Sequence, residues 1–572
     1  MNSAYILIAG IIILFIGYIT YGGWLAKKWD VNDKNITPAH TQQDGVDYVP
    51  SKAPILLGHH FASIAGAGPI NGPIQAAIFG WLPVFLWIVI GGIFFGAVQD
   101  FSSILASIRH KGRSIGYVIS EHIGSRAKKL FFIFAYLTLL LVVAAFASIV
   151  IDTFDGFTVT DGVTTTIAAN GSTAMASMLF IFVSIIFGIF LYRYKTNLLI
   201  TTIFGVIAII ACIAVGLYYP LYLNGTAWTV IIFVYVFIAS VAPVWILLQP
   251  RDYLNSFLLY GMMIAAFIGI LFTGTQMTLP AYTGFGGITG SSQLFPMLFI
   301  TVACGAISGF HSLVGSGTTS KQLNREHDAK LIGYGGMLIE CVLAIIALIA
   351  VGTLFSQGAM PSGTPTQVFA AGIANMVAAM GIPQYYDVAY IVLILAISAF
   401  ALTSLDTATR LARYMFQEFF ADEGIPAKAR KLLTNPYFST LVTVGLGALL
   451  ATGGYENIWP LFGSANQLLA VLALMAVAAW MTHEGKSNKM FLVPMAFMLV
   501  ASISALCITF YNNIMKLFVL GTGTFVAEGL QLVIIVILII FSIVLVIDGI
   551  NALKAHRQKG REDQADPGNN SA

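Results

Sequence analysis

Two stretches decide the fold of this 572-residue chain: Gly58-His59-His60-Phe61-Ala62-Ser63-Ile64-Ala65-Gly66-Ala67-Gly68-Pro69 and Gly309-Phe310-His311-Ser312-Leu313-Val314-Gly315-Ser316-Gly317-Thr318-Thr319. Both lie in apolar runs, and both contain the pattern S-x-x-G-x-G, 249 residues apart. In a helix each Gly costs about 1 kcal/mol relative to Ala, and each Pro about 3 kcal/mol. We therefore expect both helices to unwind there, which frees backbone groups that protein, ion or substrate must satisfy.

The composition around these stretches is that of a polytopic membrane protein. Hydrophobic residues make up 58% of the chain and charged residues 9%, and the mean hydropathy is +0.86. Soluble domains carry about 25% charged residues, so a soluble enzyme is excluded. The net charge of +3 gives no indication of a nucleic-acid partner. Because H-E-x-x-H, G-x-S-x-G and P-loop motifs are absent and the four cysteines lack metal-site spacing, the sequence predicts no enzyme, no cofactor and no metal site.

The hydropathy profile predicts fifteen membrane spans, and the basic residues orient them. The spans lie near residues 4–25, 53–79, 81–106, 128–152, 174–192, 196–220, 226–248, 255–274, 295–320, 331–355, 386–409, 437–452, 458–482, 490–511 and 525–550. Alternating loops then place 27 of the 28 Lys and Arg on one side, with only Lys516 opposite. The positive-inside rule therefore predicts a protein of the cytoplasmic membrane with its N-terminus outside and its C-terminus in the cytoplasm. The loops 153–173, 275–294 and 356–385, which lack Lys and Arg, should face outward.

This orientation gives the two interrupted spans opposite directions, so the repeat is inverted. A second pair of segments agrees with it: the amphipathic stretch Ser114–Ile123 on the cytoplasmic side corresponds to Thr366–Met380 outside. Interrupted spans at matching positions of inverted halves indicate the midplane site of a secondary transporter. We expect an all-α, five-plus-five inverted repeat of the amino-acid/polyamine/cation (LeuT-like) type. Its predicted parts are an N-terminal helix and loop (1–52), repeat one (53–220), two intervening helices (221–294), repeat two (295–482), two C-terminal helices (483–552) and a disordered cytoplasmic tail (553–572).

The two predicted breaks are the candidate substrate site. Half-helix N-termini offer free N–H groups and a partial positive charge, which would suit a substrate carboxylate, whereas freed carbonyls would suit a cation. The candidate binding residues are Ser63, Gly66, Gly68, Ser312, Gly315 and Gly317.

Titratable residues near the breaks are candidates for ion coupling, with H⁺ and Na⁺ both left open. His59, His60 and His311 lie beside the breaks, and imidazoles are plausible proton carriers as well as structural partners for unwound carbonyls. Glu340, inside a span, is a candidate proton relay. Asp100 has two alternative interpretations: a cytoplasmic gate that pairs with Arg109 or a neighbouring Arg in one conformation, or a residue near a helix end that reaches water.

Span 386–409 carries a polar stripe of Thr403, Asp406, Thr407 and Arg410. Thr403 and Ser404 stand where transporters of this architecture often hold sodium, an analogy of fold only. Asp406 is a further candidate for ion coupling. Asp406 and Arg410 are also spaced for a structural i,i+4 ion pair, which we favour slightly. The segment Gln249-Pro250-Arg251-Asp252 is interpreted as a helix stop followed by an Asp N-cap.

Several longer strings resemble the carbon starvation protein A (CstA) family. They are GHHFASIAGAGPI (58–70), GAVQDF (96–101), SIRHKGRSIG (107–116), LLQPRDYL (247–254), FHSLVGSGTTSKQL (310–323) and FALTSLDTATRLARY (400–414). The resemblance extends to about residue 550. It implies a bacterial or archaeal inner-membrane transporter associated with peptide uptake in carbon starvation, with proton-coupled pyruvate symporters as close relatives.

Taken together, the sequence predicts an ion-coupled symporter for short peptides. The alternative is a proton-coupled symporter for pyruvate or another small carboxylate. The expected partners are the small-molecule substrate and the lipid bilayer, and the oligomeric state is left open.

Overall fold

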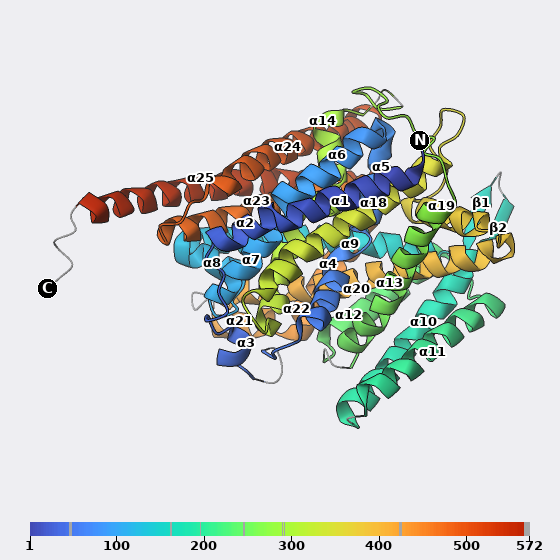
Figure 1. The fold of residues 1–572 in the computed structure, drawn as a ribbon, viewed down its shortest axis with the longest axis horizontal. Coiled ribbons are helices and arrows are strands. Elements are labelled where there is room, and N and C mark those ends of the chain that lie inside the picture. Colours follow the sequence, from blue (N-terminus) through green and yellow to red (C-terminus); the bar gives the residue numbers. More distant parts are fainter. Residues whose placement is uncertain are drawn as a thin grey trace.

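The computed structural model describes residues 1–44, 48–160, 163–194, 196–243, 246–288, 290, 292–421 and 426–565. The chain is mostly helical, and long helices lie side by side in an elongated bundle (Figure 1). One antiparallel hairpin, β1 (Phe157–Thr160) and β2 (Val163–Thr166), pairs Phe157 with Thr166 and Thr160 with Val163. Polytopic helical architecture, predicted from the composition, is confirmed.

The helices of the first half of the chain are α1 (Ser3–Ile19), α2 (Tyr21–Lys28), α3 (Pro38–Thr41), α4 (Ala53–Ala65), α5 (Gly68–Ala76), η1 (Ala77–Phe79), α6 (Trp81–Gly91), η2 (Gly92–Gly96), α7 (Ala97–Arg109), α8 (Ile115–His122), α9 (Ser125–Phe154), α10 (Ala168–Gly188), η3 (Ile189–Arg193), α11 (Leu198–Tyr218), α12 (Gly225–Val241) and α13 (Leu248–Phe272). Those of the second half are α14 (Leu294–Thr301), α15 (Ala303–Ala306), α16 (Gly309–Val314), η4 (Gly315–Thr319), α17 (Ser320–Gln322), η5 (Lys330–Gly335), α18 (Gly336–Leu354), α19 (Pro365–Ala379), η6 (Pro383–Tyr385), α20 (Tyr386–Phe420), α21 (Ala427–Leu433), α22 (Pro436–Ala451), α23 (Tyr455–His483), α24 (Lys489–Ile514), η7 (Met515–Val519), η8 (Phe525–Gly529) and α25 (Leu530–Ala565).

Eleven helices among the described residues are long and apolar enough to cross a membrane, or up to twelve if the bent pair α21–α22 is one span. Other predicted spans are shortened or interrupted: α12 has 17 residues, and the segments 53–79 and 295–320 are divided into several helices. The interior is formed by α9, α18, α20 and α23, whereas α11 is mostly exposed. The count of fifteen spans stays a prediction.

The first predicted break is present at Gly66. Helix α4 ends at Ala65 and α5 begins at Gly68, and between them Gly66 has φ 27° and ψ −158°. Residues with a side chain rarely adopt this backbone conformation, which is nearly restricted to Gly. Pro69 in the first turn of α5 suits a helix start, because its missing N–H is not needed there. The glycine pattern therefore predicted this interruption correctly.

The second interruption lies earlier than the sequence predicted. Gly315 opens the π-helical turn η4, so the chain does not unwind at Gly315 and Gly317. The extended residues are Ile307 (φ −159°, ψ 133°) and Ser308 (φ −138°, ψ 123°), between α15 and α16. A π-turn keeps backbone hydrogen bonds in a wider ring, so it accommodates the poor helix formers Gly315 and Gly317 without opening the chain.

The two interrupted segments run in opposite directions. Ser51, just before the first, forms a parallel bridge with Leu323, just after the second. At the other end of the bundle, Trp81 follows the first segment and its N–H donates to the Pro280 carbonyl in the loop that precedes the second. The start of one segment therefore lies beside the end of the other at both ends of the molecule.

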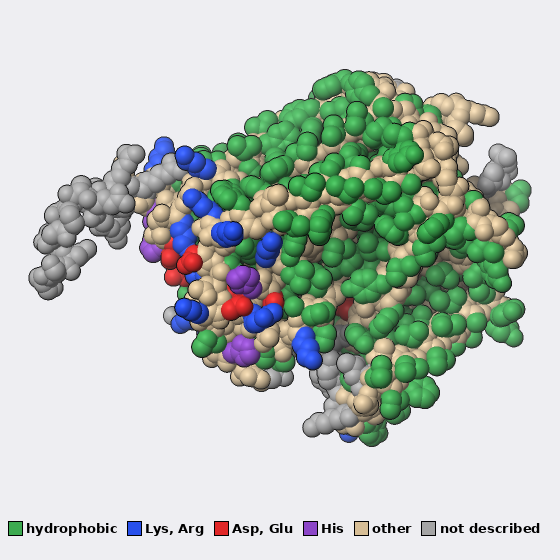
Figure 2. All heavy atoms as spheres, in the orientation of Figure 1, with side chains coloured by type: hydrophobic (Ala, Val, Ile, Leu, Met, Phe, Trp, Pro, Cys, Tyr) green, Lys and Arg blue, Asp and Glu red, His purple; other side chains and the backbone are tan. Residues whose placement is uncertain are grey.

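The polar ends of the bundle differ in charge. The N-terminus lies at the end that carries the loop after α13, since Ser3 N donates to Thr275 O at 3.0 Å. Figure 2 shows the Lys, Arg, Asp, Glu and His side chains of one face gathered toward the opposite end, near α2, α3, α7 and α8, with an apolar belt between. The orientation of these ends relative to the membrane stays a prediction.

The two predicted amphipathic segments are helices, α8 and α19, and α19 begins with a capping box formed by Thr364 and Gln367. The prediction of a disordered tail was wrong for most of its length. Helix α25 continues to Ala565, because the apolar run that starts it extends into a segment rich in helix-forming Ala, Lys, Arg, Glu and Gln. Residues 566–572 lie outside the described part of the chain.

Candidate functional site

Three ionisable side chains meet in the interior beside the first break. His311 on α16 lies between two carboxyl groups: its Nδ1 is 2.8 Å from Asp100 Oδ2 on α7, and its Nε2 is 3.4 Å from Glu340 Oε2 on α18. The three residues are at most 1% exposed. Asp100 Oδ1 and both Glu340 oxygens have no hydrogen-bond partner among the described residues. We call this set the acid–histidine triad. An ionisable group held at membrane depth is a functional candidate because isolating its charge is expensive.

The triad adjoins the end of α4. The backbone of Ile64, two residues before Gly66, lies within hydrogen-bonding reach of the His311 imidazole. His60, also on α4, is fully buried, and its Nδ1 is 2.8 Å from Thr319 Oγ1 in η4. Both interrupted segments therefore meet at the triad.

The interpretation of Asp100 as a residue that reaches water was wrong, and its role as a gate in another conformation stays a prediction. The side chain is buried against His311, so it neither reaches water nor pairs with a cytoplasmic Arg. Arg109 instead pairs with Glu326 in the connection after α17. Sequence spacing could not separate these outcomes, because the true partner of Asp100 is 211 residues away.

Gly66 places the break directly against α20. A Cβ atom added to Gly66 would lie 2.7 Å from Ser404 Oγ and 3.3 Å from Phe146 Cζ, so the backbone approaches α20 closely. The Ser404 hydroxyl is buried and has no hydrogen-bond partner in the part of the chain that the structure describes. Gly68, at the start of α5, similarly packs against Cys304 in α15. The break thus faces an unused hydroxyl.

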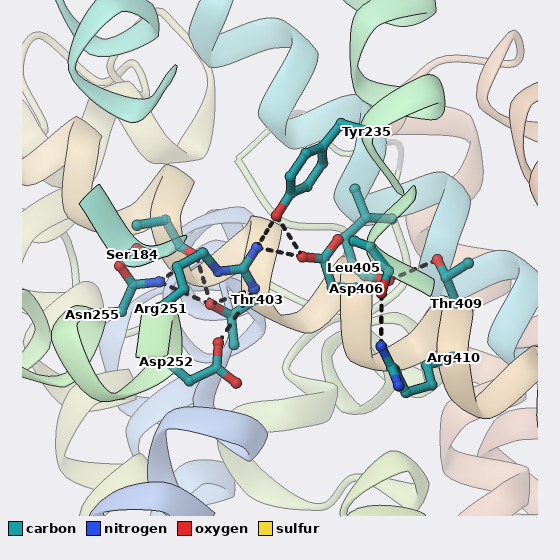
Figure 3. A network of polar contacts seen from close by, with 12 residues as sticks. Ser184, Tyr235, Arg251, Asp252, Asn255, Thr403, Leu405, Asp406, Thr409 and Arg410 are labelled. Carbon is teal, nitrogen blue, oxygen red and sulfur yellow. Dashed lines mark hydrogen bonds and ion pairs between the residues drawn. The ribbon is translucent and has the colours of Figure 1, made fainter. Parts of the chain in front are cut away.

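A second polar network surrounds Arg251 and includes Thr403 and Asp406 of α20 (Figure 3). Arg251 on α13 is 1% exposed and donates to Asp406 Oδ2 and to the Tyr235 hydroxyl oxygen, while the Tyr235 hydroxyl donates to Asp406 Oδ2 at 2.8 Å. Asp252 Oδ1 lies 3.3 Å from Arg251 Nη2. Thr403 Oγ1 accepts two hydrogen bonds, one from Arg251 Nη2 and one from Asn255 Nδ2 at 2.9 Å. Consecutive residues of α20, Thr403 and Ser404, therefore connect this network with the break.

Two predictions about this network were wrong. Asp406 pairs with Arg251, and the Arg410 guanidinium donates to the carbonyls of Ala239 and Ala242 at the end of α12. Helix α13 begins at Leu248, so Arg251 and Asp252 lie within the helix, and its N-cap is Leu247 rather than Asp252. Unsatisfied carbonyls at a helix C-terminus attract cations, which explains why Arg410 leaves the neighbouring carboxylate to Arg251.

The remaining candidates are satisfied locally. Ser63 Oγ donates to His59 O at 2.8 Å, and Ser312 Oγ donates to Gly309 O at 2.6 Å, both within their own helices. His59 is half-buried on a different face of α4 from His60. A Cβ added to Gly315 would face Ile104, and among the described residues one added to Gly317 would have only Leu411 within 4 Å. These residues lie along the interrupted segments, but none of them belongs to the acid–histidine triad.

Asn466 on α23 is a site residue that sequence analysis missed. Its Oδ1 accepts from Phe310 N at 2.9 Å, and its Nδ2 donates to Ser308 Oγ at 3.0 Å. It thereby satisfies the start of α16, the short helix that carries His311. A buried Asn inside an apolar span was the available signal, because such a residue needs partners.

The Arg251–Asp406 pair gives a stability prediction. Asp406→Ala should destabilise the protein by about 3–5 kcal/mol, because removing one partner leaves a buried charge uncompensated. Thermal unfolding in detergent measures this, with Asp387→Ala, at an exposed position of the same helix, as the control. Equal melting temperatures for the two variants would contradict a stabilising role of the Arg251–Asp406 ion pair.

Long apolar helices, two antiparallel interrupted segments and a buried acid–histidine triad define a polytopic membrane protein with ionisable groups at its centre. The chain belongs to the carbon starvation protein CstA family, whose model matches residues 2–362 and 354–505. It is 33% identical over 548 residues to "Peptide transporter CstA" of Bacillus subtilis (87% of this chain, 89% of that protein) and 34% identical over 580 residues to the protein of that name from Escherichia coli (88% and 81%). It is also 29% identical over 613 residues to "Pyruvate/proton symporter BtsT" of Escherichia coli (90% and 82%).

Among solved structures, the chain is similar to a manganese transporter of Eremococcus coleocola in complex with an aromatic bis-isothiourea substituted compound. The TM-score is 0.48 at 14% identity, over 90% of this chain and 99% of that chain.

Proposed function

We propose that this protein is a secondary active transporter that imports short peptides across the cytoplasmic membrane during carbon starvation, driven by an ion gradient. The observation that carries the proposal is the acid–histidine triad beside the break at Gly66. The family and the relatives named as peptide transporters support the substrate class. The second candidate, a proton-coupled symporter for pyruvate or another small carboxylate, is favoured by the relative named as a pyruvate/proton symporter.

The triad favours H⁺ as the coupling ion. With a protonated imidazole and one ionised carboxylate, the set Asp100, His311 and Glu340 is electrically neutral. Loss of one further proton leaves a net negative charge in a buried site, which is costly unless a cation or a structural change compensates it. Binding and release of that proton can therefore be linked to movement of the helices α7, α16 and α18 that hold the three side chains.

The antiparallel course of the two interrupted segments supports a five-plus-five inverted repeat. In this arrangement the two repeats rock against each other around a site at the breaks. The motion exposes that site alternately to the two sides of the membrane. The positions proposed to contact substrate are Gly66, Gly68 and the Ser404 hydroxyl, with Ser63, Ser312, Gly315 and Gly317 along the same segments. The alternative coupling site is a Na⁺ site at Thr403 and Ser404. The proposed orientation places the C-terminus in the cytoplasm.

Uptake into proteoliposomes tests the function. Purified protein is given a labelled dipeptide or labelled pyruvate, each under an inward proton gradient and, separately, an inward sodium gradient. We expect concentrative dipeptide uptake that requires the proton gradient and collapses with a protonophore. Accumulation of pyruvate alone would establish the second candidate, and dependence on sodium alone would exclude the triad as the coupling site.

A further inference from the structure

A cluster of histidines lies apart from the proposed transport site, at the end of the bundle where α7, α8, α23 and α25 meet. His110 directly follows α7, and His122 and His483 are the last residues of α8 and α23. The His122 ring lies 5.1 Å from the His110 ring and 5.2 Å from the His483 ring, centroid to centroid. His556 on α25 contacts His483 and donates from Nε2 to the His122 carbonyl at 3.0 Å. Four of the nine histidines of the chain thus form one cluster.

The hydrogen bonds of His110 show which of its ring nitrogens could bind a metal ion. Its Nδ1 is 2.6 Å from the Ala106 carbonyl oxygen. A carbonyl can only accept, so Nδ1 carries the proton and Nε2 presents its lone pair. This Nε2 is 2.9 Å from His122 Nε2 and 4.0 Å from Glu121 Oε2. Donation of the second ring N–H to a backbone carbonyl is the arrangement that orients most metal-binding histidines.

We propose that His110, Glu121 and His122 form a binding site for a divalent transition-metal ion of the Zn²⁺ type, next to which the His483 ring contacts His122. One ligand atom from each of the three residues lies within 4.8 Å of the others. In a tetrahedral zinc site with Zn–N bonds of about 2.0–2.1 Å, two ligand nitrogens lie about 3.3 Å apart. The two imidazoles therefore need to separate by only a few tenths of an ångström, and the exposed Glu121 side chain is free to approach.

The donor set decides the class of ion. Two imidazoles and one carboxylate suit Zn²⁺ and its neighbours, whereas Ca²⁺ and Mg²⁺ require mostly oxygen ligands. A bound ion would join the end of α7 to the end of α8. Through His483 and the bond from His556 to the His122 carbonyl, it would also fix the ends of α23 and α25. Because α7 carries Asp100, occupancy of this site constrains one of the helices that hold the triad.

Metal titration of the full-length protein tests this inference. The purified, untagged chain in detergent is stripped with a chelator and titrated with Zn²⁺ by calorimetry, and Co²⁺ is added in parallel as a spectroscopic probe. We expect one high-affinity ion per chain and the intense visible absorption of tetrahedral Co²⁺. His110→Ala and Glu121→Gln should each weaken Zn²⁺ binding at least about tenfold. Glu121 is exposed, so its variant is expected to fold normally.

The matched controls are His40→Ala and His327→Ala, two exposed histidines outside the cluster, and both should bind Zn²⁺ like the unmodified chain. Equal affinity in all variants, or an octahedral Co²⁺ spectrum, would overturn the site. The readout is metal binding, so its outcome is independent of whether the substrate is a peptide or pyruvate.

Discussion

His311→Gln is expected to reduce proton-driven uptake by about 100-fold, the scale on which removal of a proton-transferring side chain acts. Gln can still hydrogen-bond Asp100 across the present 2.8 Å contact, but it cannot carry a proton between Asp100 and Glu340. The variant should therefore keep exchange of labelled for unlabelled substrate at equal pH while it loses accumulation against a gradient. Parallel exchange and gradient-driven assays in proteoliposomes distinguish the two activities.

His40→Gln is the matched control, because His40 is exposed and lies on α3, outside the triad and both interrupted segments. Its uptake should stay within about twofold of the unmodified protein, which is the scale of a neutral surface change. If His311→Gln retains concentrative uptake with an unchanged pH profile, the acid–histidine triad is not the coupling site.

Gly66→Leu should abolish transport of either substrate. The side chain would collide with Ser404 Oγ, 2.7 Å from the position of an added Cβ, and the backbone has φ 27°. Strained backbone of this kind costs about 1–3 kcal/mol, and overpacking costs about as much again. The strain and the overpacking both arise at the contact between α4, α5 and α20, where the proposed transport site lies. Initial uptake rates and the melting temperature of the purified variant measure the two consequences.

Gly445→Leu provides the comparison, since Gly445 lies on the exposed face of α22, where no atom of the described residues is within 4 Å of an added Cβ. It should insert, melt and transport like the unmodified chain. Gly315→Leu should have an intermediate effect, because its Cβ would meet only the flexible Ile104 side chain at 3.1 Å. Normal uptake by Gly66→Leu would show that the break takes no part in transport.

The local features of the fold could be predicted from the sequence. Gly66 and Pro69 predicted the first break correctly, because backbone preferences act within a few residues. The same S-x-x-G-x-G pattern gave the wrong position for the second break, since the extended residues Ile307 and Ser308 depend on Asn466, which lies about 160 residues further along the chain. A glycine permits unwinding, but tertiary partners decide where it occurs.

The polar partners were the least predictable part of the candidate site. Histidine and carboxylates inside apolar spans identified His311, Asp100 and Glu340 individually, because each is expensive to bury alone. Their association depends on the packing of α7, α16 and α18, which no spacing rule describes. Arg251 shows the same limit: its partner Asp406 is 155 residues away, whereas the i,i+4 rule considers only neighbours on one helix.

The bridge between Ser51 and Leu323 joins the two interrupted segments at one end of the bundle. At this end of the bundle Ser51 N donates to Gln322 O, the Thr37 hydroxyl donates to Leu323 O, and Arg109 pairs with Glu326. Opening a path there breaks all three interactions, at about 0.5–1.5 kcal/mol for each hydrogen bond. If the proposed rocking of the repeats opens this end, a ligand enriches the open form only by binding it more tightly than the closed form.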